Sequence, residues 1–276
     1  MPKPSAFITL GDAMQGAVTT QWRKLQRHLA AQLKSLLAKG DFTGASELIA
    51  QITLAGLLEP LQPRLRELGI SALLLGASKV KPISRSALVQ GERLPPAFDH
   101  GLDQLQYMIE EDVSDRVRDG CFAVLRGVEL DAGASIDAAV DQLLGPLTDD
   151  WLSVSTDILY SRLVSLGFLF QAALDALDQY QVCEELDGRE CPVCALMNGR
   201  VFDVEREYDR VQQVLSTMDP AQLVSTARWP KQDAESVAWM AQLTANELQA
   251  NGWGSPPYHP HCRGYLVVPG TVEETG

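Results

Sequence analysis

The residues with the clearest chemical potential are two short pairs of metal-type ligands in the last third of the chain. Cys191 and Cys194 form a C-x-x-C pair, and His259 and Cys262 form an H-x-x-C pair with the same spacing. Two intervening residues allow both side chains of a pair to point into one tight turn, with sulfur at about 2.3 Å from a single ion. Together the pairs supply three thiolates and one imidazole, a donor set that suits tetrahedral zinc.

Other uses of these residues need to be weighed. A lone C-x-x-C pair also serves thiol–disulfide exchange, but that use needs a thioredoxin-like βαβ context, which this sequence lacks. A catalytic zinc keeps one coordination position open and has a carboxylate base nearby, whereas four good ligands close the coordination sphere. His261 could replace His259, but its place beside Cys262 would strain shared coordination in a tight turn. We therefore expect a structural zinc on four residues: Cys191, Cys194, His259 and Cys262.

The two pairs are far apart in the sequence, so a shared ion would close a long loop. Joining distant segments restricts the unfolded chain strongly, and the binding energy of the metal then becomes folding energy. Prolines at positions 192, 257 and 260 would stiffen both turns. Cys121 and Cys183 lie outside both pairs, and we expect them to be buried thiols.

The composition excludes several classes of protein. The chain has 276 residues, of which 46% are hydrophobic and 21% charged, unlike disordered, collagen-like or disulfide-scaffold chains. No stretch approaches about 18 uninterrupted apolar residues, so we expect no transmembrane helix. The N-terminus lacks a signal-peptide pattern, which predicts synthesis in a cytosol. There, five cysteines indicate thiols or metal ligands rather than disulfides.

Charge is distributed unevenly along the chain. The net charge is −13, which argues against a protein that coats nucleic acid over its whole surface. Residues 1–95 nevertheless carry 12 Lys/Arg against 6 Asp/Glu, whereas residues 96–276 carry 11 against 30. A basic first third on an acidic body suggests that the two ends face different partners. The simpler interpretation is a solvated basic helix without a partner.

Apolar periodicity predicts a mainly α chain. The expected helices share an apolar stripe at three- to four-residue spacing and cover residues 12–39, 43–59, 63–76, 99–127 with a break near Gly120, 135–144 and 149–180. Asp12 and Ser135 are the expected N-caps, and Gly145-Pro146 is expected to end a helix. Two short strands, 200–204 and 265–268, are expected to pair when the metal brings their ends together.

The same pattern divides the chain into three parts. Residues 1–95 form a basic helical region whose segment 76–96, rich in Pro, Gly and basic residues, is expected to be a linker or extended arm. Residues 96–180 form a helical body. Residues 181–276 form a small α+β module that a zinc ion would clasp.

Three segments of this module resemble a known family. The chain has L-D-G-R-E-C-P-V-C at 186–194, N-G-R-V-F at 198–202 and P-P-Y-H-P-H-C-R at 256–263. This arrangement is similar to the C-terminal module of the phage head morphogenesis proteins, the Mu F-like minor head proteins of tailed phages. The resemblance covers residues 155–268. It departs at Gly264, where many members have a further cysteine, and in the region 203–253, which is longer than usual.

The resemblance implies a structural role rather than an enzyme. Such proteins are present in few copies in the phage head, near the portal, and are associated with head assembly. The implied partners are the portal or the major capsid protein, with no membrane and no small-molecule substrate, in a virion assembled in the bacterial host cytoplasm. The basic region adds packaged DNA as a candidate partner, through phosphate contacts from four side chains: Lys79, Lys81, Arg85 and Arg93.

Two other functional classes compete with this interpretation. A zinc-dependent hydrolase or nuclease would use the Cys/His residues with Glu185, Asp187 or Glu190 as the base, but acidic residues beside a turn are more often solvated, and the ligand set leaves no open position. A zinc-ribbon regulator of duplex DNA is disfavoured by the acidic surroundings of the ligands. The sequence contains no glycine-rich phosphate loop, which excludes a nucleotide-driven motor.

Overall fold

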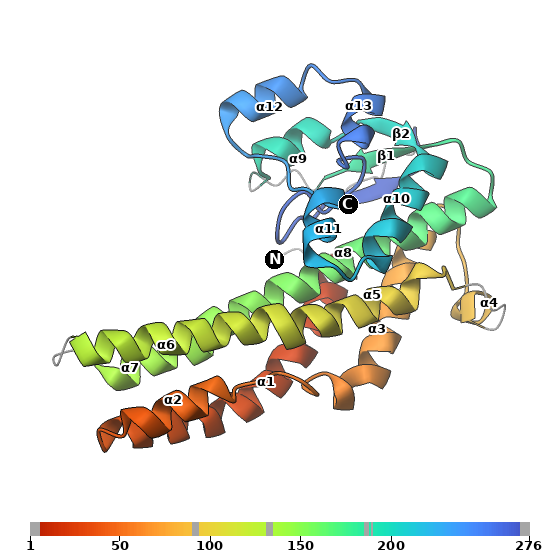
Figure 1. The fold of residues 1–276 in the computed structure, drawn as a ribbon. Helices are drawn as coiled ribbons and strands as arrows, with labels where there is room; N and C mark the ends of the chain where they lie inside the picture. Colours follow the sequence, from red (N-terminus) through yellow and green to blue (C-terminus); the bar gives the residue numbers. More distant parts are fainter. Residues whose placement is uncertain (1–5, 90–93, 131–134, 185–187, 189, 271–276) are drawn as a thin grey trace. The chain divides into compact units, whose positions relative to one another are not determined.

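The computed structural model describes residues 6–89, 94–130, 135–184, 188 and 190–270, and in these residues the chain is mainly helical, as predicted (Figure 1). The helices are α1 (Ala6–Ala38), α2 (Phe42–Ala50), α3 (Gln62–Ala77), α4 (Arg85–Val89), α5 (Ala97–Met108), α6 (Ser114–Leu130), α7 (Ile136–Gln142), α8 (Thr148–Leu174), α9 (Pro192–Met197), α10 (Val204–Ser216), α11 (Pro220–Thr226), α12 (Ala234–Met240) and α13 (Ala245–Ala250), with a 3-10 turn at Glu59–Leu61. The chain folds into two compact units.

One unit comprises residues 13–65 and 105–156, and its described residues form helices and turns. α2 packs against α6 (Figure 1). Trp22 of α1 is buried, and its indole N–H donates to the carbonyl of Leu144 at 3.1 Å. Burial of this large side chain with its polar group satisfied makes it an anchor of the unit. On the surface, Arg23 pairs with Asp149 at 2.8 Å.

Two expected helix breaks in this unit are wrong. Gly120 lies inside α6, where the side chain of Leu143 fills the space that a Cβ at 120 would occupy. This glycine therefore permits close packing and does not end a helix. Gly145 and Pro146 lie in a π-helical turn, Leu143–Leu147, that leads directly into α8. A second π-helical turn, Ile109–Val113, joins α5 to α6.

Helix ends differ from the prediction in other places. Ser135 caps α7 as expected, because its hydroxyl accepts from the Ala138 N–H at 3.5 Å. Asp12 is not an N-cap, since α1 begins at Ala6. α8 ends at Leu174 and not at 180, and the residues that follow turn into a strand.

The other unit comprises residues 6–12, 66–104 and 157–270 of the described chain. Within it, α3 crosses α8 at unusually short range. A Cβ on Gly76 would collide with the Val164 carbonyl, and one on Gly167 would collide with the Leu73 carbonyl. Two glycines thus let the helix backbones touch. The described part of the segment 76–96 falls within this unit and contains α4. The ranges 1–95, 96–180 and 181–276 stay a prediction about functional parts.

A three-stranded antiparallel sheet completes this unit. Its strands are β1 (Gln179–Cys183), β2 (Val201–Asp203) and β3 (Tyr265–Val267), in the order β2-β1-β3. Tyr180 pairs with Phe202, and Val182 pairs with Leu266. The expected pairing of strands 200–204 and 265–268 with each other is wrong, because β1 lies between them. Both strands exist near the expected places, but neither contacts the other directly.

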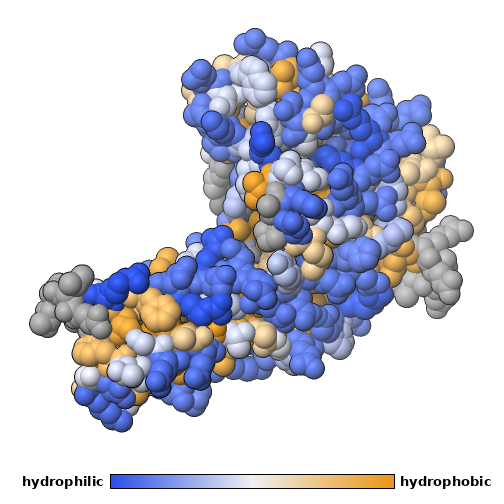
Figure 2. Space-filling view, in the orientation of Figure 1, coloured by the Kyte–Doolittle hydropathy of each residue, from blue (hydrophilic) through white to orange (hydrophobic). Residues whose placement is uncertain are grey.

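One helical stretch, Asp137–Leu174, is long and apolar enough to cross a membrane by length and composition, although no transmembrane helix was expected. Of its most apolar window, 72% is buried inside the protein, as in the core helix of a globular fold, so the observation is weak evidence for a membrane span. The face drawn in Figure 2 is largely hydrophilic, with scattered apolar patches.

Candidate metal centre

The first ligand pair lies at the start of a short helix. Cys191 is the N-cap of α9, and its sulfur accepts from the Cys194 backbone N–H at 3.3 Å. Pro192 occupies the first helical position, where no backbone donor is needed. Cys194 is buried, whereas Cys191 is half-exposed. This turn of helix places both sulfurs on the same side.

The second pair lies in the turn that precedes β3. The Cys262 N–H donates to the His259 carbonyl at 3.3 Å, which closes the turn. His261 adopts a positive φ of 60°, and its backbone N–H donates to the carboxylate of Asp157 on α8 at 2.8 Å. This bond ties the turn to the core helix of the unit. Cys262 is buried, so its sulfur faces the protein interior.

The two pairs meet at Cys194. Its Sγ lies 3.1 Å from His259 Nε2 and 3.7 Å from Cys262 Sγ. Two sulfurs bound to one tetrahedral zinc lie about 3.8 Å apart, since each Zn–S bond is about 2.3 Å. The Cys194–Cys262 separation fits that value, whereas the Cys194–His259 separation is that of a hydrogen bond. The four predicted ligands therefore come together in a cluster that could hold a metal ion.

The ligand atoms form two overlapping triads, in each of which all atoms lie within 4.8 Å of one another. One triad contains Cys191, Cys194 and His259, and the other contains Glu184, Cys194 and Cys262. We call the four predicted ligands the Cys/His cluster and treat Glu184 as an additional neighbour. Sequence reasoning missed Glu184, because its position carries no ligand spacing and it reaches the cluster only through β1.

Glu184 is buried at the end of β1, where its backbone N–H donates to Asn198 Oδ1 at 3.0 Å. Its carboxylate lies against Gly264, the position at which the resembling family often has a further cysteine. A carboxylate oxygen thus lies where a cysteine at position 264 would have added a fourth sulfur to the three of the cluster.

The two buried thiols of the cluster share a hydrogen bond, which shifts their pKa values in opposite directions. Donation from Cys194 to Cys262 lowers the pKa of Cys262, and the same bond, reinforced by burial, raises the pKa of Cys194. A bound cation would displace the proton that the two sulfurs share, because metal ligation requires both thiols to be thiolates.

His261, the alternative ligand, lies outside both triads. Its Nδ1 is 3.8 Å from the Asp157 carboxylate, and its side chain is 52% exposed. Burial raises the pKa of Asp157, although the His261 imidazole opposes that shift. Position 261 thus contacts α8 through Asp157.

The remaining cysteines, Cys121 and Cys183, are free thiols in this structure. Cys121 is buried, as predicted, and burial raises its pKa to about 12. Cys183 is only half-buried, and its thiol donates to the Tyr265 hydroxyl at 3.4 Å. Of the three acidic residues suggested as bases, Glu185 and Asp187 lie outside the described residues. Glu190 accepts from the Gly188 N–H at 2.8 Å in an exposed turn.

The basic residues suggested for DNA already contact other groups of this chain. The Lys79 ammonium lies 4.6 Å from the centre of the Tyr265 ring, Lys81 pairs with Asp175, and Arg85 lies 3.8 Å from Glu67. Arg93 lies outside the described residues. DNA binding through this segment would therefore exchange intramolecular partners for phosphates.

Taken from the residues upward, the site consists of soft sulfur donors, one imidazole and a buried carboxylate, collected by β1, α9 and the turn before β3. The comparisons with known proteins add no relative to this description: no protein-family model, no curated protein and no solved structure matches the chain.

Proposed function

We propose that the Cys/His cluster holds one structural Zn²⁺ ion. The observation that carries the proposal is the convergence on Cys194 of residues from two distant segments, with His259 65 positions further along the chain. Thiolate and imidazole donors favour zinc over the harder divalent cations. When bound, the ion would supply a cross-link between the start of α9 and the turn before β3, with no open position required for chemistry.

Native mass spectrometry of the full chain, purified without chelator, tests this proposal. We expect one zinc ion per wild-type chain, and a reduced zinc content in His259→Ala and in Cys262→Ser. Cys183→Ser is the matched control, because Cys183 lies outside both triads and should leave the zinc content unchanged. Wild-type protein without metal, or a Cys183→Ser variant as deficient as Cys262→Ser, would contradict a specific site.

We further propose that the chain is a minor head protein of a tailed phage or prophage, acting in head assembly near the portal. Support comes from the motif resemblance together with the Cys/His cluster, whose members come from the first and the last of the resembling segments. The portal and the major capsid protein are the proposed partners, and the virion is the proposed location. The resemblance rests on the motifs, because the comparisons supply no relative.

Quantitative mass spectrometry of procapsids and mature particles from the encoding phage tests the assembly role. We expect a low, fixed copy number relative to the major capsid protein, and co-purification with the portal after mild disruption. A chain that is absent from both particles would overturn the role but leave the zinc site untouched.

Packaged DNA is a secondary partner in this proposal. Because Lys81 and Arg85 have acidic partners in the chain, we expect weak binding of the full chain to duplex DNA. For three phosphate contacts, affinity should fall on the order of 40-fold when salt rises about fourfold. If retention on DNA is independent of salt, or is unchanged in a Lys79→Glu/Lys81→Glu/Arg85→Glu variant, these residues do not bind phosphates.

One observation supports the alternative function, a zinc-dependent hydrolase or nuclease. The Glu184 carboxylate is buried, and one of its oxygens lies within 4.8 Å of the sulfurs of Cys194 and Cys262. Glu184→Gln separates the two functions, since it keeps the shape of the side chain. The structural proposal predicts that this variant retains zinc and that neither protein hydrolyses nucleic acid. A measured nuclease activity of the wild type, lost in Glu184→Gln with zinc retained, would favour the enzyme.

A further inference from the structure

A cavity in the unit that contains α10 is lined by an excess of positive charge. Its volume, measured as the space open to the centres of water molecules, is about 20 Å³, whereas one water needs roughly 10–15 Å³ by this measure. Its charged and aromatic lining comprises Arg162, Arg210, Arg228, Trp229, Trp253 and Tyr258. No acidic side chain is among the described residues that line it.

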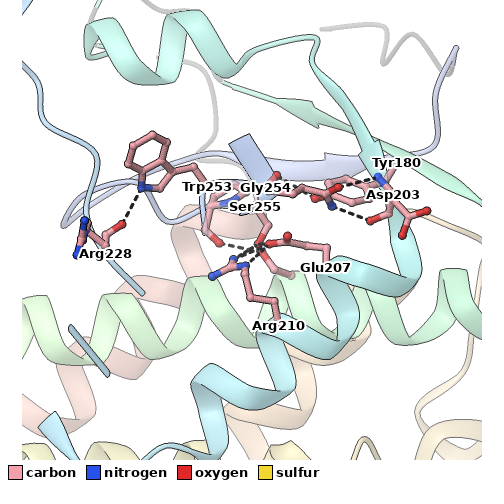
Figure 3. A network of polar contacts seen from close by, with 11 residues as sticks. Tyr180, Asp203, Glu207, Arg210, Arg228, Trp253, Gly254 and Ser255 are labelled. Atoms are coloured by element: carbon pink, nitrogen blue, oxygen red, sulfur yellow. Dashed lines mark hydrogen bonds and ion pairs between the residues drawn. The ribbon is translucent and has the colours of Figure 1, made fainter. Parts of the chain in front are cut away.

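One of the arginines is already neutralised. Arg210 donates through Nε to the Glu207 carboxylate at 2.9 Å and through Nη2 to the Ser255 hydroxyl at 3.1 Å (Figure 3). The Ser255 hydroxyl donates in turn to the same Glu207 oxygen at 2.6 Å. Burial alone would lower the pKa of Arg210, but the Glu207 carboxylate raises it above its usual value. The buried Glu207 and the partly exposed Arg210 thus form a pair of balanced charge.

Arg162 of α8 has no such partner. Its side chain is buried, with 8% of the residue exposed, and its hydrogen bond within the described structure goes to the neutral amide oxygen of Gln104 at 3.3 Å. No carboxylate among the described residues lies within ion-pair distance of it. Burial and the neighbouring Arg210 lower the pKa of Arg162 to about 10, so the group is still charged at neutral pH. Arg162 is therefore a buried charge without a carboxylate partner among the described residues, a costly arrangement unless a further anion binds.

A second unsatisfied group lines the same cavity. Tyr258 is 1% exposed, and its hydroxyl has no hydrogen-bond partner among the described residues. A buried hydroxyl without a partner loses the hydrogen bonds that water would provide. Trp253 forms an adjacent wall, and its indole N–H is satisfied by the Arg228 carbonyl at 2.9 Å (Figure 3). Among the buried side chains of the lining, Arg162 bonds to Gln104 alone and the Tyr258 hydroxyl has no partner in the described residues.

We propose that this cavity binds a small oxyanion, with Arg162 as the charged donor and Tyr258 as a neutral donor. Guanidinium groups bind planar carboxylates and tetrahedral phosphates through paired N–H donors. The cavity volume restricts the ligand to a free ion or to one such group at the cavity mouth. The proposal does not rest on the assembly role, and its charged donor, Arg162, lies outside the Cys/His cluster, although Tyr258 directly precedes His259.

Isothermal titration calorimetry of the full chain, purified without chelator, with inorganic phosphate and with acetate, at matched ionic strength in chloride, tests the proposal. We expect saturable binding of at least one of the two ions, and the stronger one identifies the phosphate or the carboxylate class. Arg162→Met should weaken that binding by about tenfold or more, and Tyr258→Phe by a smaller factor. Arg206→Met, which removes an exposed arginine from the same helix as Arg210, is the matched control and should bind as the wild type does.

The outcomes remain decisive if one variant fails to fold. Tyr258→Phe changes a single hydroxyl, so its weakened binding would support the site even if Arg162→Met were unstable. The absence of saturable binding by the wild type up to about 10 mM of either ion, or equal weakening by Arg162→Met and Arg206→Met, would overturn the proposal. In the first case the buried charge of Arg162 is structural, and in the second the anions act by general screening.

Discussion

The carboxylate of Glu184 lies in the space that a side chain at Gly264 would need. Glu184 follows β1 and Gly264 precedes β3, and the pairing of Cys183 with Tyr265 brings the two positions together. The missing Cβ at 264 therefore lets a carboxylate approach the thiols of the Cys/His cluster.

Replacement of this glycine tests the relationship. Gly264→Ala should destabilise the protein by roughly 1–3 kcal/mol, because the new methyl group overlaps the Glu184 carboxylate. Urea denaturation of both proteins measures the difference. The same substitution should cost less in a Glu184→Ala background, since the colliding oxygen is gone. Equal costs in the two backgrounds would show that the two residues do not interact.

The crossing of α3 and α8 makes a second prediction. Gly167→Ala should reduce the free energy of unfolding by roughly 2–4 kcal/mol, because its Cβ would meet the Leu73 backbone, which cannot rotate away. Gly16→Ala is the control, since it lies within α1 and its Cβ would have no neighbour within 4 Å. That substitution should stabilise the protein by up to about 1 kcal/mol. Similar melting temperatures for the two variants would argue against the close crossing.

Removal of the metal is expected to lower the thermal stability of the protein. If zinc links the two ends of a long loop, chelation should lower the melting temperature on the order of 10 °C. The effect should shrink at lower pH, because protons compete with zinc for the thiolate and imidazole donors and the bound ion then stabilises the fold less. Calorimetry before and after chelation, with zinc content measured in both samples, checks this. Complete zinc removal without a change in melting temperature would show that the ion is not structural.

Cys121 offers a pH-dependent test in the helical unit. Burial raises the pKa of this thiol from 9.0 to about 12. The protonated thiol therefore contributes fully to the free energy of unfolding below pH 9, and this contribution is lost as the pH rises towards 12. The reason is that the unfolded state releases the proton first. The stability advantage of wild type over Cys121→Ala should therefore shrink by about 1.4 kcal/mol between pH 8 and pH 10. In the folded protein, alkylating reagents should modify Cys183 before Cys121.

The helices and the ligand set could be predicted from the sequence because both depend on local spacing. Apolar periodicity identified the helical regions, and the Ser135 cap follows from residue type alone. The C-x-x-C and H-x-x-C pairs named four residues that the fold does bring together. Each of these signals lies within a few neighbouring positions.

The parts that were missed depend on tertiary contacts. No strand was expected at β1, whose first two residues were placed at the end of a helix because they follow its apolar pattern. Pairing on both edges makes this segment a strand. Glu184 owes its place to that strand. Gly120 suggested a helix break, but its role is to admit Leu143. Local sequence cannot distinguish a glycine that ends a helix from one that lets another chain segment approach.

The central position of β1 also determines the order in which the strands pair during folding. β2 follows β1 after a short connection, so these two strands can form a hairpin at a small entropic cost. β3 must return across the whole region from α10 to α13 before it finds the other edge of β1, and contacts of such long sequence separation form slowly. The Cys/His cluster can close only after that return. If the cluster binds zinc as proposed, metal capture is a late folding event, and cells starved of zinc would accumulate chains with a formed hairpin and an unpaired last strand.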